Sequence, residues 1–464
     1  MSISGLLHTA KDALMVHQMA IDVTGANISN VNTPGYSRQR VNMASTGVTN
    51  IPANQYQNSV NVASVTRIYN NYLEFQITEQ RGLTGYSQTM VEVLSVMDAI
   101  FDESKRGGLS DLMNRFWNDW QSLALNPGGM VEREALASSA HAVASTINNI
   151  NLGLYSISGN VERDIEYTVG EINSLIADIA DLNKKIVAAA AGTGDRNILE
   201  DTRTELVKRL SALVDVQVID GDHGTIKVSL KNGETLVDGV VTRPLETQMR
   251  SGDPTKSDIF FADNNTNPAA AVTDWITRGK LGALLEMRNE VIPQYMEQMN
   301  DLAAALITEI NGVHQGGFDY YQNPGLDFFE FGFGGETIRV NPAILADVRL
   351  IAAAAMSHGE DGGNALKISL LQDMRIASIN NQTFSGYYGG VVGKIGHQTA
   401  DNQRNLIHQS MVMVTLENHR ESVSGVSIDE EMIKLIQYQL GYNAAAKLAA
   451  TAQEMMNTLL QLKQ

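Results

Sequence analysis

The chain has 464 residues, enough for two to four domains, and its 43% hydrophobic and 19% charged residues are typical of a globular protein. The formal net charge of −18 argues against binding nucleic acid or an anionic membrane over a broad surface, so we expect neither as a partner. The absence of cysteine excludes disulfides, thiolate metal ligands and cysteine nucleophiles.

The first thirty residues predict an amphipathic helix. Leu7, Leu14, Ile21 and Ile28 recur every seven residues, which is the spacing of a coiled-coil seam. The same stretch has no basic n-region, no continuous apolar core and no small-residue cleavage site. No segment reaches the ~18 apolar residues of a membrane span. We therefore expect a protein that is cytoplasmic or exported without a cleaved signal peptide.

Residues 26–36, ANISNVNTPGY, predict the end of this helix and a tight turn. Asparagine side chains such as those of Asn27, Asn30 and Asn32 compete for backbone hydrogen bonds and favour helix ends. Pro34 and Gly35 then occupy the second and third positions of a four-residue type II turn that closes at Tyr36. Two candidate strands follow within residues 37–70, YSRQRVNM and SVNVASVTRI.

The middle of the chain changes from helical to strand period and back. Helices are predicted at 72–101, at 109–125 and from 131, with a heptad seam over 161–187 that ends at Gly192. From 214 the apolar residues alternate, and Asn232-Gly233 between two such runs is a strong hairpin signal. Helical period returns over 280–312. Residues 313–345 are rich in glycine and aromatic residues and predict a long excursion with strands, and helices dominate from about 362.

The last predicted helix carries a second heptad seam. It opens with Ser427-Ile428-Asp429-Glu430, a capping-box pattern. Two apolar rows follow at heptad spacing: Ile428, Leu435, Tyr442, Ala449 and Met456 in one, and Ala445, Ala452 and Leu459 in the other. The two end helices are therefore expected to pair with each other within the chain or with other subunits, and the period alone leaves both possibilities open.

These patterns predict a mainly α fold with a β-rich inserted domain: terminal coiled-coil helices, an elongated helical body and a small β domain. We place the helical terminal domain at 1–60 with 415–464, the body at 61–213 with 276–414, and the β-rich domain at 214–275.

No catalytic, cofactor-binding or metal-binding residues stand out. His397, His408 and His419 recur every eleven residues, which puts them near one face of a helix but ~16 Å apart, too far to share a metal ion. The glycine-rich stretches do not fit a nucleotide-binding loop, and there is no HExxH. We therefore expect no enzyme and no cofactor.

Several segments resemble one protein family. ANISNVNTPGYSRQRV resembles the N-terminal signature of bacterial flagellar axial proteins, the rod, hook and hook-associated group. Its ending, Tyr36-Ser37-Arg38-Gln39, is similar to the hook-associated protein 1 family, which forms the junction between hook and filament. Other segments resemble that family in the same order along the chain: 123–149, 197–239, 279–319 and 424–462.

The resemblance implies a structural subunit that leaves the cell by flagellar type III export and is located in the extracellular flagellum. It implies self-assembly into a ring, with residues 6–28 and 428–460 in an inner tube. The implied partners are further copies, the hook protein, a second junction protein next to the filament, and an export chaperone on the C-terminal helix. The N-terminal interface candidates are Leu7, Leu14, Ile21, Asn27, Ile28, Asn30, Asn32, Pro34, Gly35 and Tyr36. The C-terminal assembly or chaperone candidates are Ile428, Leu435, Tyr442, Ala449, Ala452, Met456 and Leu459.

Two other functions compete with this one. A hook or distal-rod subunit is the alternative within the same assembly, and the Ser-Arg-Gln after Tyr36 argues against it. A flagellum-associated wall hydrolase or protease would need an acid–base or metal site, and none is readable. The chain is also shorter than the longer members of the family, so we expect an outermost domain to be missing.

Overall fold

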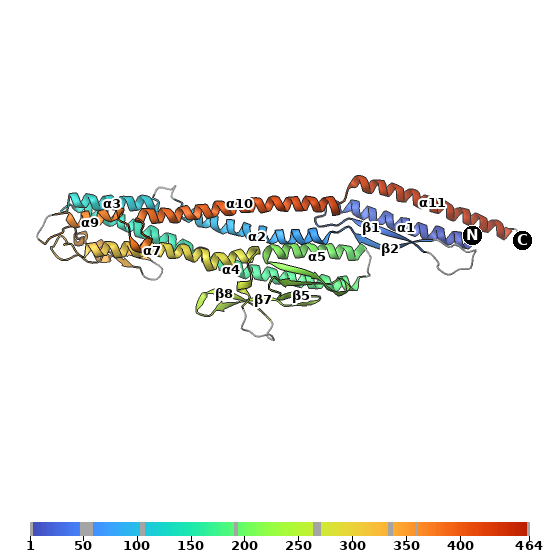
Figure 1. Cartoon of the computed structure of the whole chain (residues 1–464), viewed down its shortest axis with the longest axis horizontal. Helices are drawn as coiled ribbons and strands as arrows, with labels where there is room; N and C mark the ends of the chain where they lie inside the picture. Colours follow the sequence, from blue (N-terminus) through green and yellow to red (C-terminus); the bar gives the residue numbers. More distant parts are fainter. Residues whose placement is uncertain are drawn as a thin grey trace.

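Long helices that run along one axis make the molecule elongated, and both chain ends lie at the same end of it (Figure 1). The computed structural model describes residues 3–46, 59–102, 107–189, 194–262, 271–332, 337–357 and 361–461. It confirms the predicted fold class, a mainly helical chain with long terminal helices and a small β-containing region.

The two terminal helices pair with each other. α1 (Ile3–Ser29) and α11 (Ile428–Gln461) lie antiparallel, and the hairpin of β1 (Gln39–Thr46) and β2 (Ser59–Arg67) packs against α1. We call these four elements the terminal coil. Small side chains let the helices approach closely: Ala10, Ala20 and Ala452 are fully buried and Ala445 nearly so.

The body is a bundle of long helices. Its helices are α2 (Asn71–Ile100), α3 (Leu109–Leu125), α4 (Met130–Ala188), α5 (Gly194–Leu213), α6 (Gly279–Glu286), α7 (Ile292–His314), α8 (Pro342–Ala346), α9 (Gly363–Leu370) and α10 (Phe384–Ser424). A π-helical turn, Met287–Val291, joins α6 to α7. α4 alone has 59 residues and is roughly 90 Å long. The predicted helices at 72–101, at 109–125 and from 131 are confirmed, and the predicted stop at Gly192 falls outside the described residues.

Short antiparallel strands lie on one flank of α4 and α5 (Figure 1). β3 (Val216–Asp220), β4 (Ile226–Leu230), β5 (Thr235–Asp238) and β6 (Val241–Thr242) form a sheet in that order, and β7 (Leu245–Arg250) pairs with β8 (Asp253–Phe261). β9 (Phe329–Phe331) and β10 (Ile338–Val340) pair separately. The predicted hairpin is confirmed, since Gly233 takes a φ of +91° between β4 and β5. Short 3₁₀ turns lie at Asp222–Gly224, Thr273–Trp275, Val348–Leu350, Leu371–Asp373 and Ala377–Ile379.

One apolar core runs through the body and into the strands. Trp117 and Trp120 are fully buried beside Phe116 and Phe328. The same cluster continues to residues of β4, β5 and β8, so the strands have no separate core. The proposed boundaries at 60 and 415 fall inside β2 and α10. We now propose to divide the chain after β2 and between α10 and α11.

Candidate functional site: the joint between terminal coil and body

The turn after α1 brings the chain from the terminal coil to the body. The N–H of Tyr36 donates to the carbonyl of Thr33 at 3.2 Å, and Gly35 has a φ of +81°. The ring of Pro34 fixes the φ of Pro34 itself. A fixed φ at this position followed by the positive φ of Gly35 is the geometry of the predicted type II turn. The turn directs Tyr36 and the three residues after it inward, where Tyr36, Ser37 and Gln39 are buried.

Asn27 holds the turn against α11. Its amide nitrogen donates to the carbonyl of Gln39 at 2.9 Å and to Oε2 of Glu431 at 2.8 Å. Its amide oxygen accepts from the Tyr36 hydroxyl and from the N–H of Gln39, both at 2.9 Å. Asn27 is 1% exposed, and these four bonds use the whole capacity of a side-chain amide. One side chain therefore fixes the end of α1, the start of β1 and the start of α11.

Glu431 is the buried charge of this network. Its other oxygen accepts from Arg38 at 2.8 Å and from Lys434 at 3.2 Å, while Arg38 also pairs with the exposed Glu430 at 2.7 Å. Burial raises the pKa of the Glu431 carboxyl, but hydrogen bonds from Asn27, Lys434 and Arg38 outweigh it and hold that pKa below its usual value. Burial, with the nearby carboxylates of Asp201 and Glu431, raises the pKa of Tyr36 to about 12. Glu431 is therefore ionised and Tyr36 neutral at physiological pH.

The body contributes ion pairs from α5 and α2. Asp201 of α5 accepts from the N–H of Ser37 at 2.9 Å and from Arg67 at 2.7 Å. Burial raises the pKa of Asp201 in spite of its pairing with Arg67. In α2, Glu74 binds both Lys208 at 2.7 Å and Arg420 at 3.1 Å.

Arg420, near the end of α10, closes the network by donating to the carbonyl of Tyr36 at 3.3 Å. We call the set that links the terminal coil to α2, α5 and α10 the joint: Asn27, Tyr36, Ser37, Arg38, Gln39, Arg67, Glu74, Asp201, Arg420 and Glu431.

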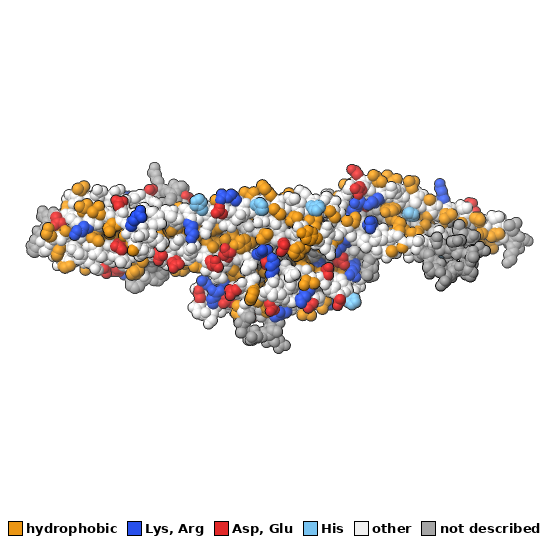
Figure 2. All heavy atoms as spheres, in the orientation of Figure 1, with side chains coloured by type: hydrophobic (Ala, Val, Ile, Leu, Met, Phe, Trp, Pro, Cys, Tyr) orange, Lys and Arg blue, Asp and Glu red, His pale blue; other side chains and the backbone are white. Residues whose placement is uncertain are grey.

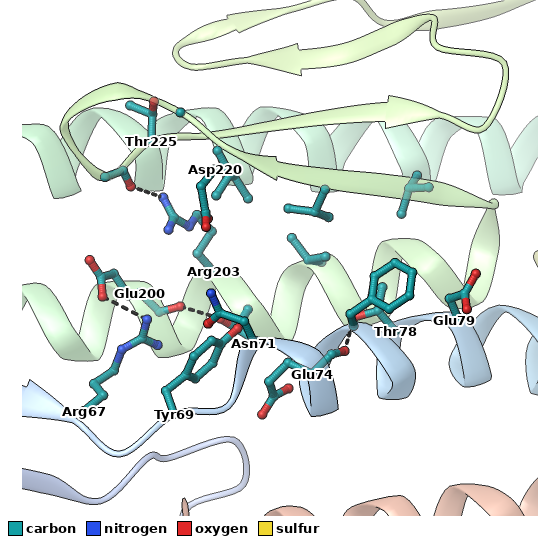
Figure 3. Close-up of a pocket in the computed structure, with 18 residues that line it drawn as sticks. Arg67, Tyr69, Asn71, Glu74, Thr78, Glu79, Glu200, Arg203, Asp220 and Thr225 are labelled. Atoms are coloured by element: carbon teal, nitrogen blue, oxygen red, sulfur yellow. Dashed lines mark hydrogen bonds and ion pairs between the residues drawn. The ribbon is translucent and has the colours of Figure 1, made fainter.

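A cavity of about 350 Å³ adjoins the joint between α2, α5 and the β3–β4 sheet (Figure 3). Arg67 pairs with Glu200 at 2.9 Å and lies over the Tyr69 ring at 4.6 Å. Arg203 donates to the carbonyl of Gly224 at 2.8 Å, and burial lowers its pKa to about 10. These charged groups link α5 to β2 and to the turn between β3 and β4, which form walls of the cavity.

The N-terminal candidates divide into two groups. Asn27 and Tyr36 are buried within the chain, so their hydrogen bonds serve the joint and are not free for a neighbouring subunit. The Asn30 side chain, just past the end of α1, donates to the carbonyl of Ala26 and accepts from the hydroxyl of Thr33. The remaining candidates are half-buried or exposed, and their role in assembly stays a prediction: Leu7, Leu14, Ile21, Ile28, Asn32, Pro34 and Gly35.

The C-terminal candidates divide in the same way. Ala452 is fully buried, whereas Ile428 and Leu459 are 50% and 53% exposed. The half-buried candidates are Leu435, Tyr442, Ala449 and Met456. Because the structure contains one chain, the role of these residues in an interface stays a prediction. Ser427 caps α11, since its Oγ accepts from the N–H of Glu430 at 3.5 Å, but the Glu430 carboxylate pairs with Arg38.

Sequence reasoning missed most of the joint. Arg38 and Gln39 served only as a family signature, and Arg67, Asp201 and Arg420 were not singled out. One signal was available: Glu431 occupies the same heptad row as Ala445 and Ala452, and a carboxylate in a buried row requires partners. No set of three or more His, Asp or Glu side chains in the described residues could hold a metal ion. The helices described here include none that is long and apolar enough to cross a membrane.

An elongated helical body whose two chain ends form one paired unit is an architecture suited to a structural protein, and the comparisons with known proteins show which class. The family model for the flagellar hook-associated protein FlgK helical domain matches residues 94–329, just over half of the chain. The chain therefore belongs to this flagellar hook-associated protein family. Residues 7–36 match the flagella basal body rod protein model, and 419–462 match the C-terminal model of the flagellar basal body rod FlgEFG proteins.

Curated relatives share the full length of the chain. Flagellar hook-associated protein 1 of Bacillus subtilis is 28% identical over 98% of this chain and 97% of its own length. The protein of the same name from Salmonella typhimurium is 24% identical over 99% of this chain and all of its own, in an alignment of 554 residues. Because this chain has only 464 residues, at least 90 residues of that relative have no counterpart here.

The fold has a counterpart among solved structures. The flagellar hook junction protein FlgK from Burkholderia pseudomallei superposes with a TM-score of 0.66 at 16% identity, covering 75% of this chain and all of that one. At this identity the likeness concerns the fold, which agrees with the elongated helical architecture described above.

Proposed function

We propose that the chain is a structural subunit of the bacterial flagellum that forms the junction between hook and filament, and that it assembles through its terminal coil after type III export. Its family and the names of its full-length relatives support this role. As a flagellar hook-associated protein it belongs to the extracellular flagellum.

One observation carries the assembly step: α11 exposes a large apolar face where it is not covered by α1. Five apolar side chains within its first four turns are each 44–65% exposed: Ile428, Met432, Ile433, Ile436 and Leu440. Figure 2 shows hydrophobic side chains along the upper right of the molecule, where Figure 1 places α11. Contiguous exposed apolar surface of this kind is typical of a protein interaction site.

The partners follow from the same surface. In the assembled ring, further copies cover the free face of α11, and the hook protein and a second junction protein contact the ring on its two sides. Before export a chaperone covers α11. Residues 94–329 favour this role over a hook or distal-rod subunit, because they match the model of the hook-associated helical domain, whereas the chain ends match rod models. The alternative of a wall hydrolase or protease is tested by activity, and we expect the purified protein to show no turnover of peptidoglycan or casein.

Gene deletion, followed by electron microscopy of cells and an immunoblot of the medium for flagellin, tests the proposal. We expect hooks of normal length without filaments, and flagellin lost to the medium. Missing or abnormal hooks would place the protein in the rod or hook, and intact filaments would refute the assignment.

A change in the turn tests the part played by the joint. Replacing Pro34-Gly35 with Ala-Ala should impair assembly more than it impairs folding of the body, because the turn only directs the chain between the two. Wild-type swimming of that strain would contradict this role.

A further inference from the structure

α11 contains a single glycine, and a histidine of α1 fills the space that it leaves. A Cβ atom at Gly441 would lie 2.5 Å from Cε1 and 2.6 Å from Nε2 of His17, which is closer than real Cβ contacts. The His17 ring also lies 6.4 Å from that of Tyr438. Nδ1 of His17 is buried and has no hydrogen-bond partner in the described structure, so no bond to this nitrogen keeps the ring beside Gly441 and Tyr438.

Apart from the Asn27–Glu431 bond at one end, the small side chains of the seam do not by themselves fix its register. Both helices bury alanines along the seam, Ala10 and Ala20 in α1 and Ala445 and Ala452 in α11. Because these side chains are alike, a shift of α11 by one heptad, about 10 Å, would still bring small residues face to face. The same shift would place Lys434 or Leu448 opposite His17, where neither leaves room for the ring.

We propose that the contact of His17 with Gly441 determines the register in which α1 and α11 pair, and thereby positions the face of α11 on which assembly depends. Asn27 lies ten residues after His17, and Glu431 lies ten residues before Gly441, so the joint and this contact belong to the same antiparallel register. The polar bond fixes one end of the pair and the steric contact fixes its middle. The consequence for assembly rests on the proposed function, whereas the register is a property of the single chain.

Distance measurement in the full-length chain tests the register. Exposed Lys11 and Thr451 are replaced with cysteine and spin-labelled, and no native cysteine interferes. The parent should give one narrow distance. Gly441→Ala, which ordinarily strengthens a helix, should displace or broaden it, with a shift of up to about 10 Å for a full heptad. His17→Ala combined with Gly441→Ala should restore the parent distance.

Gly25→Ala is the matched control, since Gly25 is a helical glycine of α1 with no atom within 4 Å of an added Cβ. It should leave the distance unchanged. Three results would overturn the register contact. The distance could be unchanged in Gly441→Ala, or the distance distribution of the parent could be as broad as that of Gly441→Ala. The double variant could also fail to recover the parent distance.

A strain lacking the gene separates this proposal from the proposed function. Gly441→Ala should reduce the number of cells with filaments, and the double variant should restore it. If the distances behave as expected but cells without the gene still build normal filaments, the register contact stands and the proposed function fails.

Discussion

The body and the terminal coil are stabilised in different ways. The body buries tryptophan and phenylalanine side chains in one continuous apolar core. The terminal coil has a small cluster of Ala20, Val41 and Val65, and it depends on alanine contacts and on the polar joint. Buried apolar area is the main source of folding free energy, and hydrogen bonds add only about 1 kcal/mol each. We therefore expect the body to fold alone, and the terminal coil to depend on the joint and on the partners proposed above.

Limited proteolysis of the isolated chain should show the largest contrast between the two regions. We expect both ends to be removed first, leaving a resistant core of very roughly residues 60–415, because amphipathic helices without partners are only marginally stable. α10 reaches Ser424 and is tied to α2 through Arg420, so the C-terminal cut should fall close to the start of α11. Ends that resist protease in a dilute monomer would count against assembly through the terminal coil.

Removing a core aromatic side chain should weaken the body most. Trp120 is fully buried against Phe116 and Phe328, so Trp120→Ala should cost about 3–5 kcal/mol in free energy of unfolding. Urea denaturation followed by circular dichroism measures this loss. Leu125→Ala, at a position 84% exposed in the same helix, is the control and should change stability by less than about 0.5 kcal/mol. Equal losses in the two variants would contradict the description of the core.

Acid should act on the body through His314. Its Nδ1 donates to the carbonyl of Leu326 at 2.5 Å and its Nε2 accepts from the N–H of Ala352 at 2.8 Å, so the buried ring is neutral. Burial lowers the pKa of His314 to about 4, from about 6.5 in the unfolded chain. The unfolded state therefore binds the proton first, and stability on the order of 3 kcal/mol is lost as pH falls from 6.5 towards 4.

Urea denaturation at pH 7 and pH 4.5 checks this loss. His314→Gln keeps one donor and one acceptor without a titrating ring, so its stability should depend less on pH in this window. His419→Gln, at an exposed position in α10, should behave as the parent does. The same pH dependence in all three proteins would refute the role of His314.

Local patterns predicted the elements well but not the joint. The seven-residue spacing of the end helices and the Asn232-Gly233 turn are recorded in neighbouring residues, so both could be read from the sequence. The joint combines Asn27 with Glu431, which are 404 positions apart, and Ser37 with Asp201, which are 164 apart. In the sequence, a lone carboxylate such as Asp201 resembles any solvent-exposed charge. Only the packing of α5 against the turn reveals that it is buried.

The joint should be most sensitive at Asn27. Asn27→Ala leaves buried partners such as Tyr36 and Glu431 without hydrogen bonds, and should cost about 1–3 kcal/mol in the opening free energy of the terminal coil. Hydrogen exchange of α11 amides measures this opening, and exchange in α4 should stay unchanged. Asn30→Ala is the matched control, because the Asn30 side chain bonds locally, to the carbonyl of Ala26 and the hydroxyl of Thr33, and not to α11. Similar exchange rates in Asn27→Ala and Asn30→Ala would show that Asn27 is not central to the joint.

The turn at Gly35 should have the smallest effect, and its cause is different. The φ of Gly35 is +81°, a conformation that costs other residues about 1–2 kcal/mol. A Cβ there would lie 3.5 Å from the nearest atom of Glu205, which is ordinary contact, so Gly35→Ala should carry only this conformational cost. Gly35→Asn should cost less than Gly35→Ala, because asparagine tolerates positive φ. Both are measured by the same α11 exchange. Two results would contradict this: equal effects of asparagine and alanine at position 35, or an effect of either that is larger than that of Asn27→Ala. Crowding against α5, and not backbone conformation, would then limit the turn. The joint would be packed more tightly against the body than its contacts indicate.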